Sequence, residues 1–414
     1  MIKHFKAFEF RVSRENLAGP CSAGWQQFLS SFANRPSGNV HPRRCLPALA
    51  LFLLLLLVGL PAQAANYTFQ GLNIPLGCTG GNGNFTCVAL ILGVGDTISI
   101  SSPTTITVIG ALTTGASSRI NATGSSSLNL VVNGLTTLGA STVVKANLSS
   151  TAGVITIGER NSFTGTIKTA TAAINVGAGS TITGPISTTI TGAVTIGANA
   201  VVNGNISTAT GVVTIGADTV VNGNVSTVVG AVTTGAGSSV TGSVVTQVGA
   251  ITIAGNVGGK INSLDGSQAG AVTVSAGGVV IGSIITGAGA VTVGASATTS
   301  GIATNIGAIT VGADSNVTGS LCSGMAGAIT VGARSKVAGN IITKNAGAIT
   351  IGALAQVAGS VTVMKAGAKV VGAGAVVGVS ENSIQCTDVA VVVTPPVSGP
   401  PTIKSRQWRQ IFMR

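Results

Sequence analysis

Short runs of alternating apolar and polar residues recur along most of the chain. Within residues 192–208, GAVTIGANAVVNGNIST, Val194 and Ile196 flank Thr195, and a near-copy, GVVTIGADTVVNGNVST, follows almost at once. Successive side chains of a β-strand point to opposite faces, so Val194 and Ile196 are predicted to point inward and Thr195 outward. Each unit divides into three such pieces, separated by Gly, Asn or Ala. The pattern therefore predicts short strands joined by tight corners.

The third position of the motif (A/V)-(I/V)-T-(I/V)-G recurs at steps of 18 to 21 residues. A period near 20 residues is typical of solenoids, in which each unit buries its apolar face by stacking on its neighbours. Three strands per unit predict an all-β fold, a three-sided parallel β-helix (solenoid) of about fourteen coils over residues 95–380. At about 4.8 Å per stacked strand, such a rod is about 70 Å long. The third position is occupied by Thr156, Asn175, Thr195, Thr214, Thr233, Thr252, Thr273, Thr292, Thr310, Thr330 and Thr350.

Glycine occupies many of the predicted corners, including Gly197 and Gly204. At such corners we expect either a positive φ or a close approach of two backbones. Frequent Gly with dense Thr and Val disfavours helix. The strict apolar alternation disfavours disorder, although 60 of the 414 residues are Gly.

The segment before the repeats, residues 65–94, is predicted to form an N-terminal cap. Its stretch CTGGNGNFTC places turn residues between Cys78 and Cys87, which predicts a disulfide in an oxidising compartment. Cys322 and Cys386 form the remaining pair. They are either a second disulfide or two separate buried thiols.

After the repeats, residues 381–394 are predicted to form a closing segment, and residues 395–414 a Pro-rich spacer and basic tail. Apolar side chains of the tail share one face at helical spacing, with basic side chains beside them. The tail is either a disordered end or an amphipathic anchor for an acidic membrane surface or a sorting partner. The anchor residues would be Arg406, Trp408, Arg409, Ile411 and Phe412.

A purely apolar run, LPALALFLLLLLVGL, follows HPRR and precedes PAQA. A basic flank, a short apolar core and small residues at the end predict a signal peptide at residues 41–64, cleaved after Ala64. The alternative is a retained membrane anchor, although the run is shorter than the roughly 20 residues that span a bilayer. Residues 1–40 are either an unstructured leader or the product of a start codon assigned too early. We predict an exported protein, in the periplasm, on the outer surface or extracellular.

Charge and candidate chemistry narrow the function further. The net charge of +12 falls to +7 beyond residue 64, and four of the remaining basic residues lie in the last eleven positions. This distribution argues against nucleic-acid binding. His4 and His41 both precede the predicted cleavage site, which removes Ser-His-Asp catalysis and the commonest metal ligand. Asp218 and Asp314 match in position but lie about 24 Å apart, beyond the roughly 10 Å that glycosidases use. We predict no catalytic residue, cofactor or metal.

The Thr residues at the third motif position are predicted to form an outward column. Regular Thr arrays on β-solenoids resemble ice-binding faces, although those carry paired Thr rows, whereas here Ala and Gly occupy the neighbouring outward positions. The alternative interpretation is that Thr is a favourable solvent-facing residue of a strand.

The three-sided repeats resemble the bactofilins, a family of polymer-forming cytoskeletal proteins. The resemblance covers roughly residues 150–375, through units such as GAITVGARSKVAGNI. It implies a right-handed β-helix that polymerises end to end. The chain departs from that family in its signal segment, its length and its disulfide. It is also similar to secreted proteobacterial repeat proteins with AITIG and VxGxI coils.

We therefore predict a non-catalytic, exported structural or surface rod. Its partner would be another copy of itself or another cell-envelope component, and membrane contact would be limited to the signal segment and the tail. The alternative function is an adhesin or an ice-binding surface that uses the Thr column.

Overall fold

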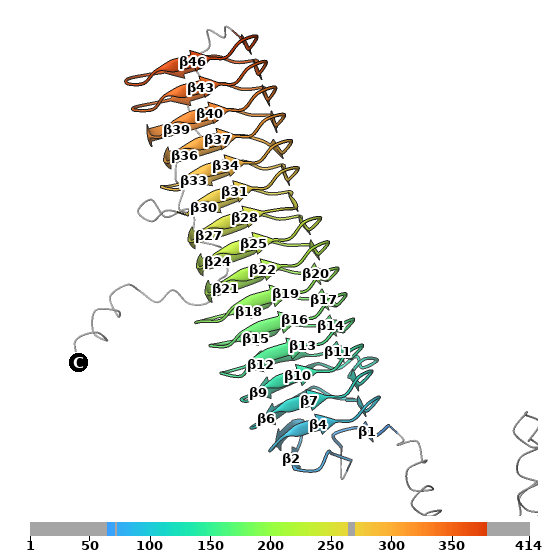
Figure 1. The fold of residues 1–414 in the computed structure, drawn as a ribbon. Helices are drawn as coiled ribbons and strands as arrows, with labels where there is room; N and C mark the ends of the chain where they lie inside the picture. Colours follow the sequence, from blue (N-terminus) through green and yellow to red (C-terminus); the bar gives the residue numbers. More distant parts are fainter. Residues whose placement is uncertain (1–63, 71–72, 264–269, 379–414) are drawn as a thin grey trace, which may run out of the picture. The chain divides into compact units, whose positions relative to one another are not determined.

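Figure 1 shows the computed structural model, which describes residues 64–70, 73–263 and 270–378. These residues form an all-β solenoid of three sheets around one core, as the repeat predicts. The predicted leader, signal peptide, closing segment and tail lie outside the described residues.

One coil consists of three strands in chain order: β19 (Val194–Ile196), β20 (Val201–Asn203) and β21 (Ile206–Thr210). The next coil begins at β22 (Val213–Ile215), which lies parallel to β19. Thr195 pairs with Thr214, so one turn of the solenoid takes 19 residues here. Every strand thus hydrogen-bonds to its counterpart one coil away.

We call the three sheets I, II and III; along one coil the chain passes through sheet II, then sheet I, then sheet III. Sheet I has 16 strands, from β1 (Asn66–Tyr67) to β47 (Val376–Val377). Sheet II has 15 strands, from β4 (Leu90–Leu92) to β46 (Lys369–Val371). Sheet III has 16 strands and ends at β45 (Val361–Val363).

Sheet III starts with the cap hairpin, β2 (Cys78–Gly81) and β3 (Asn84–Cys87), which is antiparallel. From β3 onward the sheet is parallel. The solenoid therefore has about one coil more than the predicted fourteen, because β1, β3 and β4 within the predicted cap already pair with the coil that follows.

The core consists of small aliphatic side chains stacked in columns. Val194, Ile206 and Val213 are fully buried. Phe163 in β14 (Ser162–Thr164) is the largest fully buried side chain. Small uniform side chains suit a triangular interior whose three walls are only a few residues wide. The stacking buries apolar surface that no single coil could cover.

Buried hydroxyl groups close the corner between sheets III and II. Thr208 donates to the carbonyl oxygen of Gly211 at 3.0 Å, and Thr304 donates to that of Gly307 at 2.8 Å. A buried polar group without a partner costs about 1–3 kcal/mol, so these bonds make an interior hydroxyl tolerable. The pairing repeats as T-x-x-G in the sequence, and our sequence analysis did not recognise it.

A second set of buried hydroxyls ties neighbouring coils together at the corner between sheets II and I. Ser180 donates to the carbonyl oxygen of Gly158 at 3.0 Å, and Thr219 to that of Gly197 at 2.8 Å. Each bond spans one coil, so it stabilises the stack in addition to the sheet ladders.

Corner glycines are required by a positive φ together with close backbone approach at one kind of corner, and by close approach alone at another. Gly211 has a φ of 156°, and a Cβ there would lie 2.1 Å from the carbonyl oxygen of Gly192. Gly204 has no positive φ, but its Cβ would lie 2.3 Å from the carbonyl oxygen of Gly184. Close stacking of the coils thus excludes larger residues at both positions.

The two ends of the described solenoid differ. At the N-terminal end the rings of Phe69 and Phe85 pack edge to face, with centroids 5.1 Å apart, and both side chains are buried. The Asp96 carboxylate accepts hydrogen bonds from the amides of Ala65 and Gly93 at 2.7 and 2.6 Å. In the last described coil, Val371 is 43% exposed although its counterpart Ile351 is buried.

Candidate functional site

The outward column of sheet II is the most regular surface of the described solenoid. Its middle residues pair one above another from coil to coil: Thr195 with Thr214, and Thr310 with Thr330. Because side chains alternate along each strand, the Val and Ile residues on either side of these threonines are buried. Exposed members are Thr195, Thr233, Thr273, Thr292, Thr310, Thr330 and Thr350, and half-buried members are Thr156, Asn175, Thr214 and Thr252.

Two further threonines extend this column toward the N-terminus. Thr137 pairs with Thr156, and Thr113 pairs with Thr137. The motif does not match them because Leu112 precedes Thr113, and Thr136 precedes Thr137 with Leu138 after it. A motif that admits Leu and Thr at the two flanking inward positions finds both. The described column ends in apolar residues, Ile91 and Val370.

Small residues flank the threonines on both sides. In the coil of Thr195, the neighbouring outward positions are Ala193 and Gly197. A Cβ on Gly197 would lie 2.6 Å from the amide nitrogen of Ala178 in the coil below, so stacking requires glycine there. Ala254 and Ser275 occupy the equivalent position in two other coils, and Leu135, Val154 and Val212 occupy that of Ala193 in three. From Thr113 to Thr350, the outer face of sheet II therefore has a mostly Ala column, a Thr column and a mostly Gly column, which we call the Gly groove because glycine has no side chain.

Large exposed apolar side chains gather at the corner that leads from sheet III into sheet II. We call this row the corner ridge. It borders the Ala column, where Val212 is also exposed. The ridge consists of Val88, Ile109, Ile190, Val228, Ile306 and Met325.

Among the described strands of sheet II, β46 alone carries a charged residue, Lys369, and Lys344 and Lys365 lie at the corner that leads from sheet III into sheet II. Arg119 and Lys145 belong to strands of sheet I, and Lys168 belongs to sheet III. Asp314 and Arg334 lie at the corner between sheets II and I. The outward Ala, Thr and Gly positions of sheet II carry no charge from β7 (Leu112–Thr114) to β43 (Ile349–Ile351).

Asp314 and Arg334 form a two-pronged ion pair between neighbouring coils. The Nε and Nη2 atoms of Arg334 donate to the two carboxylate oxygens of Asp314, each at 2.7 Å. These hydrogen bonds hold the pKa of Asp314 below its ordinary value of 3.8 and raise the pKa of Arg334. Both side chains are exposed, so the pair is screened by solvent and has a structural role.

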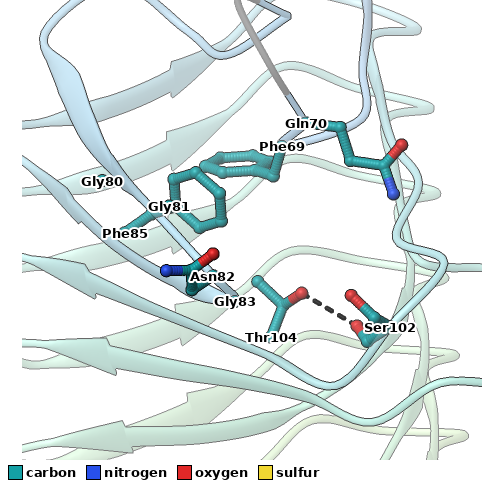
Figure 2. A pocket seen from close by; sticks show the side chains of 9 residues that line it. All are labelled: Phe69, Gln70, Gly80, Gly81, Asn82, Gly83, Phe85, Ser102 and Thr104. Carbon is teal, nitrogen blue, oxygen red and sulfur yellow. Dashed lines mark hydrogen bonds between the residues drawn. The ribbon is translucent and has the colours of Figure 1, made fainter.

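A pocket of about 350 Å³ lies in the N-terminal cap. Figure 2 shows the rings of Phe69 and Phe85 side by side at one wall, and the Thr104 hydroxyl donating to the carbonyl oxygen of Ser102, at 2.9 Å. The lining has no charged or nucleophilic group besides hydroxyls, so it offers no catalytic constellation. The lining residues are Phe69, Gln70, Gly80, Gly81, Asn82, Gly83, Phe85, Ser102 and Thr104.

The disulfide predicted between Cys78 and Cys87 is present, and it joins directly opposed residues of the cap hairpin. Cys322 is buried in β39 (Leu321–Ala326), but Cys386 lies outside the described residues, so that pairing stays a prediction. The predicted tail anchor, Arg406, Trp408, Arg409, Ile411 and Phe412, also lies outside them.

No group of three or more His, Cys, Asp or Glu side chains within residues 64–70, 73–263 and 270–378 could hold a metal ion. The same part of the chain contains no helix long and apolar enough to cross a bilayer.

The fold and this surface define the class of the protein, a three-sided parallel β-solenoid with a neutral, regularly patterned face. Comparison with protein-family models, with curated proteins and with solved structures finds no match. The likeness to bactofilins therefore stays a resemblance of the repeats.

Proposed function

We propose that the protein is a non-catalytic structural rod that is exported and assembles with copies of itself or with another cell-envelope component. The observation that carries the proposal is the unbroken parallel ladder of sheet II, 15 strands from β4 to β46. Such a ladder fixes the length and direction of the molecule, because every coil is hydrogen-bonded to the next. The repeat encodes a stiff spacer of defined length.

The cap disulfide and the predicted signal peptide, residues 41–64, support the proposed export. A short hairpin disulfide persists in an oxidising compartment and is rare in a reducing one. The aromatic pair and the hairpin at the N-terminal end would also block strand pairing at that edge, which is the usual hazard of an open sheet. We therefore expect end-to-end growth through the N-terminal end to be suppressed.

Electron microscopy of the purified protein, combined with cell fractionation, tests the proposal. We expect rods about 70 Å long, and an oxidised Cys78–Cys87 pair in protein recovered from outside the cytoplasm. Irregular particles, or protein found only in the cytoplasm with reduced cysteines, would contradict the rod or its export respectively.

The regular threonine face favours a second candidate function, an adhesin or ice-binding surface. Thermal hysteresis of the purified protein would show ice binding directly. Replacing Thr195, Thr214 and Thr233 by Lys would abolish that activity, while the same change on sheet I would leave it intact.

A further inference from the structure

Two features of sheet II point to a further interaction surface. First, the corner ridge exposes large apolar side chains beside outward positions that carry no charge from β7 to β43. Large apolar side chains that gather on one exposed surface are typical of a protein–protein contact. Second, the face has relief, because a row of threonines stands between an Ala column and a Gly groove.

The relief fits a second copy of the same face. A two-fold axis parallel to the rod reverses the order of columns on the partner while keeping the coils at equal height. If the partner is then displaced sideways by one column, its Ala column lies over the Thr column. The same displacement brings each corner ridge over the partner's Gly groove. Large side chains thus meet the groove, and threonines meet alanines, on both copies.

Equal coil height matters for this fit. Most threonines then lie opposite an Ala of the matching coil, and those of three coils lie opposite Leu135, Val154 and Val212. The spacing of about 4.8 Å is shared along the whole face. An axis perpendicular to the rod would instead place threonine over threonine and ridge over ridge. The column order therefore selects parallel rods.

The available area is sufficient for a stable pair. Fifteen strands at about 4.8 Å span about 67 Å, and the Ala to Gly columns span about 13 Å at roughly 3.3 Å per residue. This gives about 900 Å² on each copy, against about 800 Å² per partner in a standard stable interface. The corner ridge adds to this area.

We propose that sheet II and the corner ridge form a dimer interface, through which two copies of this chain lie side by side and parallel. The proposal rests on the proposed function of a structural rod, and it assigns the self-assembly to the side of the rod. Charged residues on strands of the other two sheets, such as Arg119, Lys145 and Lys168, would then face solvent.

Sedimentation equilibrium of the purified full chain tests the proposal. We expect the parent protein to be a dimer at micromolar concentration. The variant with both Thr195→Lys and Thr233→Lys should have a dissociation constant at least about a hundredfold higher, because each copy would bury two unpaired ammonium groups against its partner. The matched control is Thr181→Lys with Asn256→Lys, two exposed positions on sheet I. The control pair should leave the dissociation constant within about twofold of the parent.

The direction of the rods has its own test. Copies with Thr310→Cys mixed with copies carrying Ala308→Cys should form a cross-linked dimer on mild oxidation, because the two residues lie at equal height in opposed columns. Thr310→Cys mixed with Thr156→Cys should not, because these residues are eight coils apart, whereas antiparallel rods would place their two coils opposite each other. Cross-linking only in the second mixture would overturn the parallel arrangement.

Other outcomes separate this inference from the proposed function. Monomeric rods of about 70 Å, or a dimer that both lysine pairs affect equally, would overturn the interface and leave the rod intact. Monomers with thermal hysteresis that the sheet II lysines abolish would assign the face to ice instead. Absence of rods would overturn the proposed function itself. Circular dichroism of each variant confirms that the solenoid is folded.

Discussion

At the scale of single residues, matching positions in neighbouring coils interact through the stacking. Asp314 and Arg334 both occupy a corner position with positive φ, 58° and 57°. They are 20 residues apart in sequence and one coil apart in space. The guanidinium can therefore reach the carboxylate with two hydrogen bonds.

Removing the guanidinium should raise the pKa of the Asp314 carboxyl. In the parent protein that pKa lies below its ordinary value of 3.8, mainly because Arg334 donates hydrogen bonds to the ionised form. The pair therefore adds stability above the ordinary pKa, and the contribution is lost as the pH falls through the lower, folded value. In Arg334→Ala, carboxyl-carbon NMR titration should show a pKa close to 3.8.

Lys336→Ala is the control for this titration. Lys336 is exposed in β41 (Lys336–Val337), in the same coil as Arg334, and it makes no ion pair with Asp314 among the described contacts. An unchanged pKa of Asp314 in Arg334→Ala would contradict the hydrogen-bonded pair.

Glycine substitutions should separate close coil stacking from backbone strain. We expect Gly211→Ala to destabilise the coils around it by more than about 3 kcal/mol, because the Cβ collides with the backbone below in addition to the strained φ. Gly277 has a φ of 71°, but no atom lies within 4 Å of where its Cβ would be. Gly277→Ala should therefore lower the local stability by only about 1 kcal/mol. Amide hydrogen exchange in the surrounding strands measures both losses, and equal losses would refute the role of stacking.

At the scale of secondary-structure elements, each strand is too short to be stable alone. Most strands have two to five residues, and their stability comes from the ladder on either side and the core beneath. The end elements have a ladder on one side only. The cap hairpin, β2 and β3, compensates through its disulfide and its buried aromatic rings.

Removing the cap disulfide should loosen the N-terminal coils selectively. With Cys78→Ala and Cys87→Ala together, we expect the local stability of the hairpin to fall by about 2–3 kcal/mol, because the open loop gains conformational entropy. Hydrogen exchange should accelerate in β3 and β6 (Thr104–Val108) and remain unchanged in β22.

A reductant supplies the control for the cap. It should reproduce the faster exchange in the parent protein and have no effect on the double Ala variant. Equal acceleration along the whole solenoid would show instead that the coils unfold as one cooperative unit.

At the scale of the whole molecule, the repeat makes the described solenoid modular. Val213 pairs with Val232 one coil later, and both are fully buried. Residues 211–229 and the residues after them thus occupy equivalent positions. Length and core are set by how many coils are stacked.

Deleting one complete coil should therefore shorten the rod without unfolding it. Removal of residues 211–229 joins two equivalent corners, and small-angle X-ray scattering should show a rod about 4.8 Å shorter. Removal of residues 211–220 is the control, since it leaves half a coil and moves core side chains out of register. That variant should lose β-structure by circular dichroism, and an equally folded result would contradict register as the determinant.

The sequence by itself determined the solenoid, because both of its signals are local. Alternation around Thr195 fixes which side chains are inside, and a period near 20 residues fixes the stacking. The cap disulfide was also predictable, since Cys78 and Cys87 flank an obvious turn.

Only the tertiary structure decided how the columns meet. The groove beside Thr195 exists because the coil below excludes a side chain at Gly197. The buried bond of Thr208 depends on the corner that Gly211 makes, and the Asp314–Arg334 pair depends on the register of neighbouring coils. The physical reason is the same in each case: these contacts join residues that become neighbours only when the coils stack.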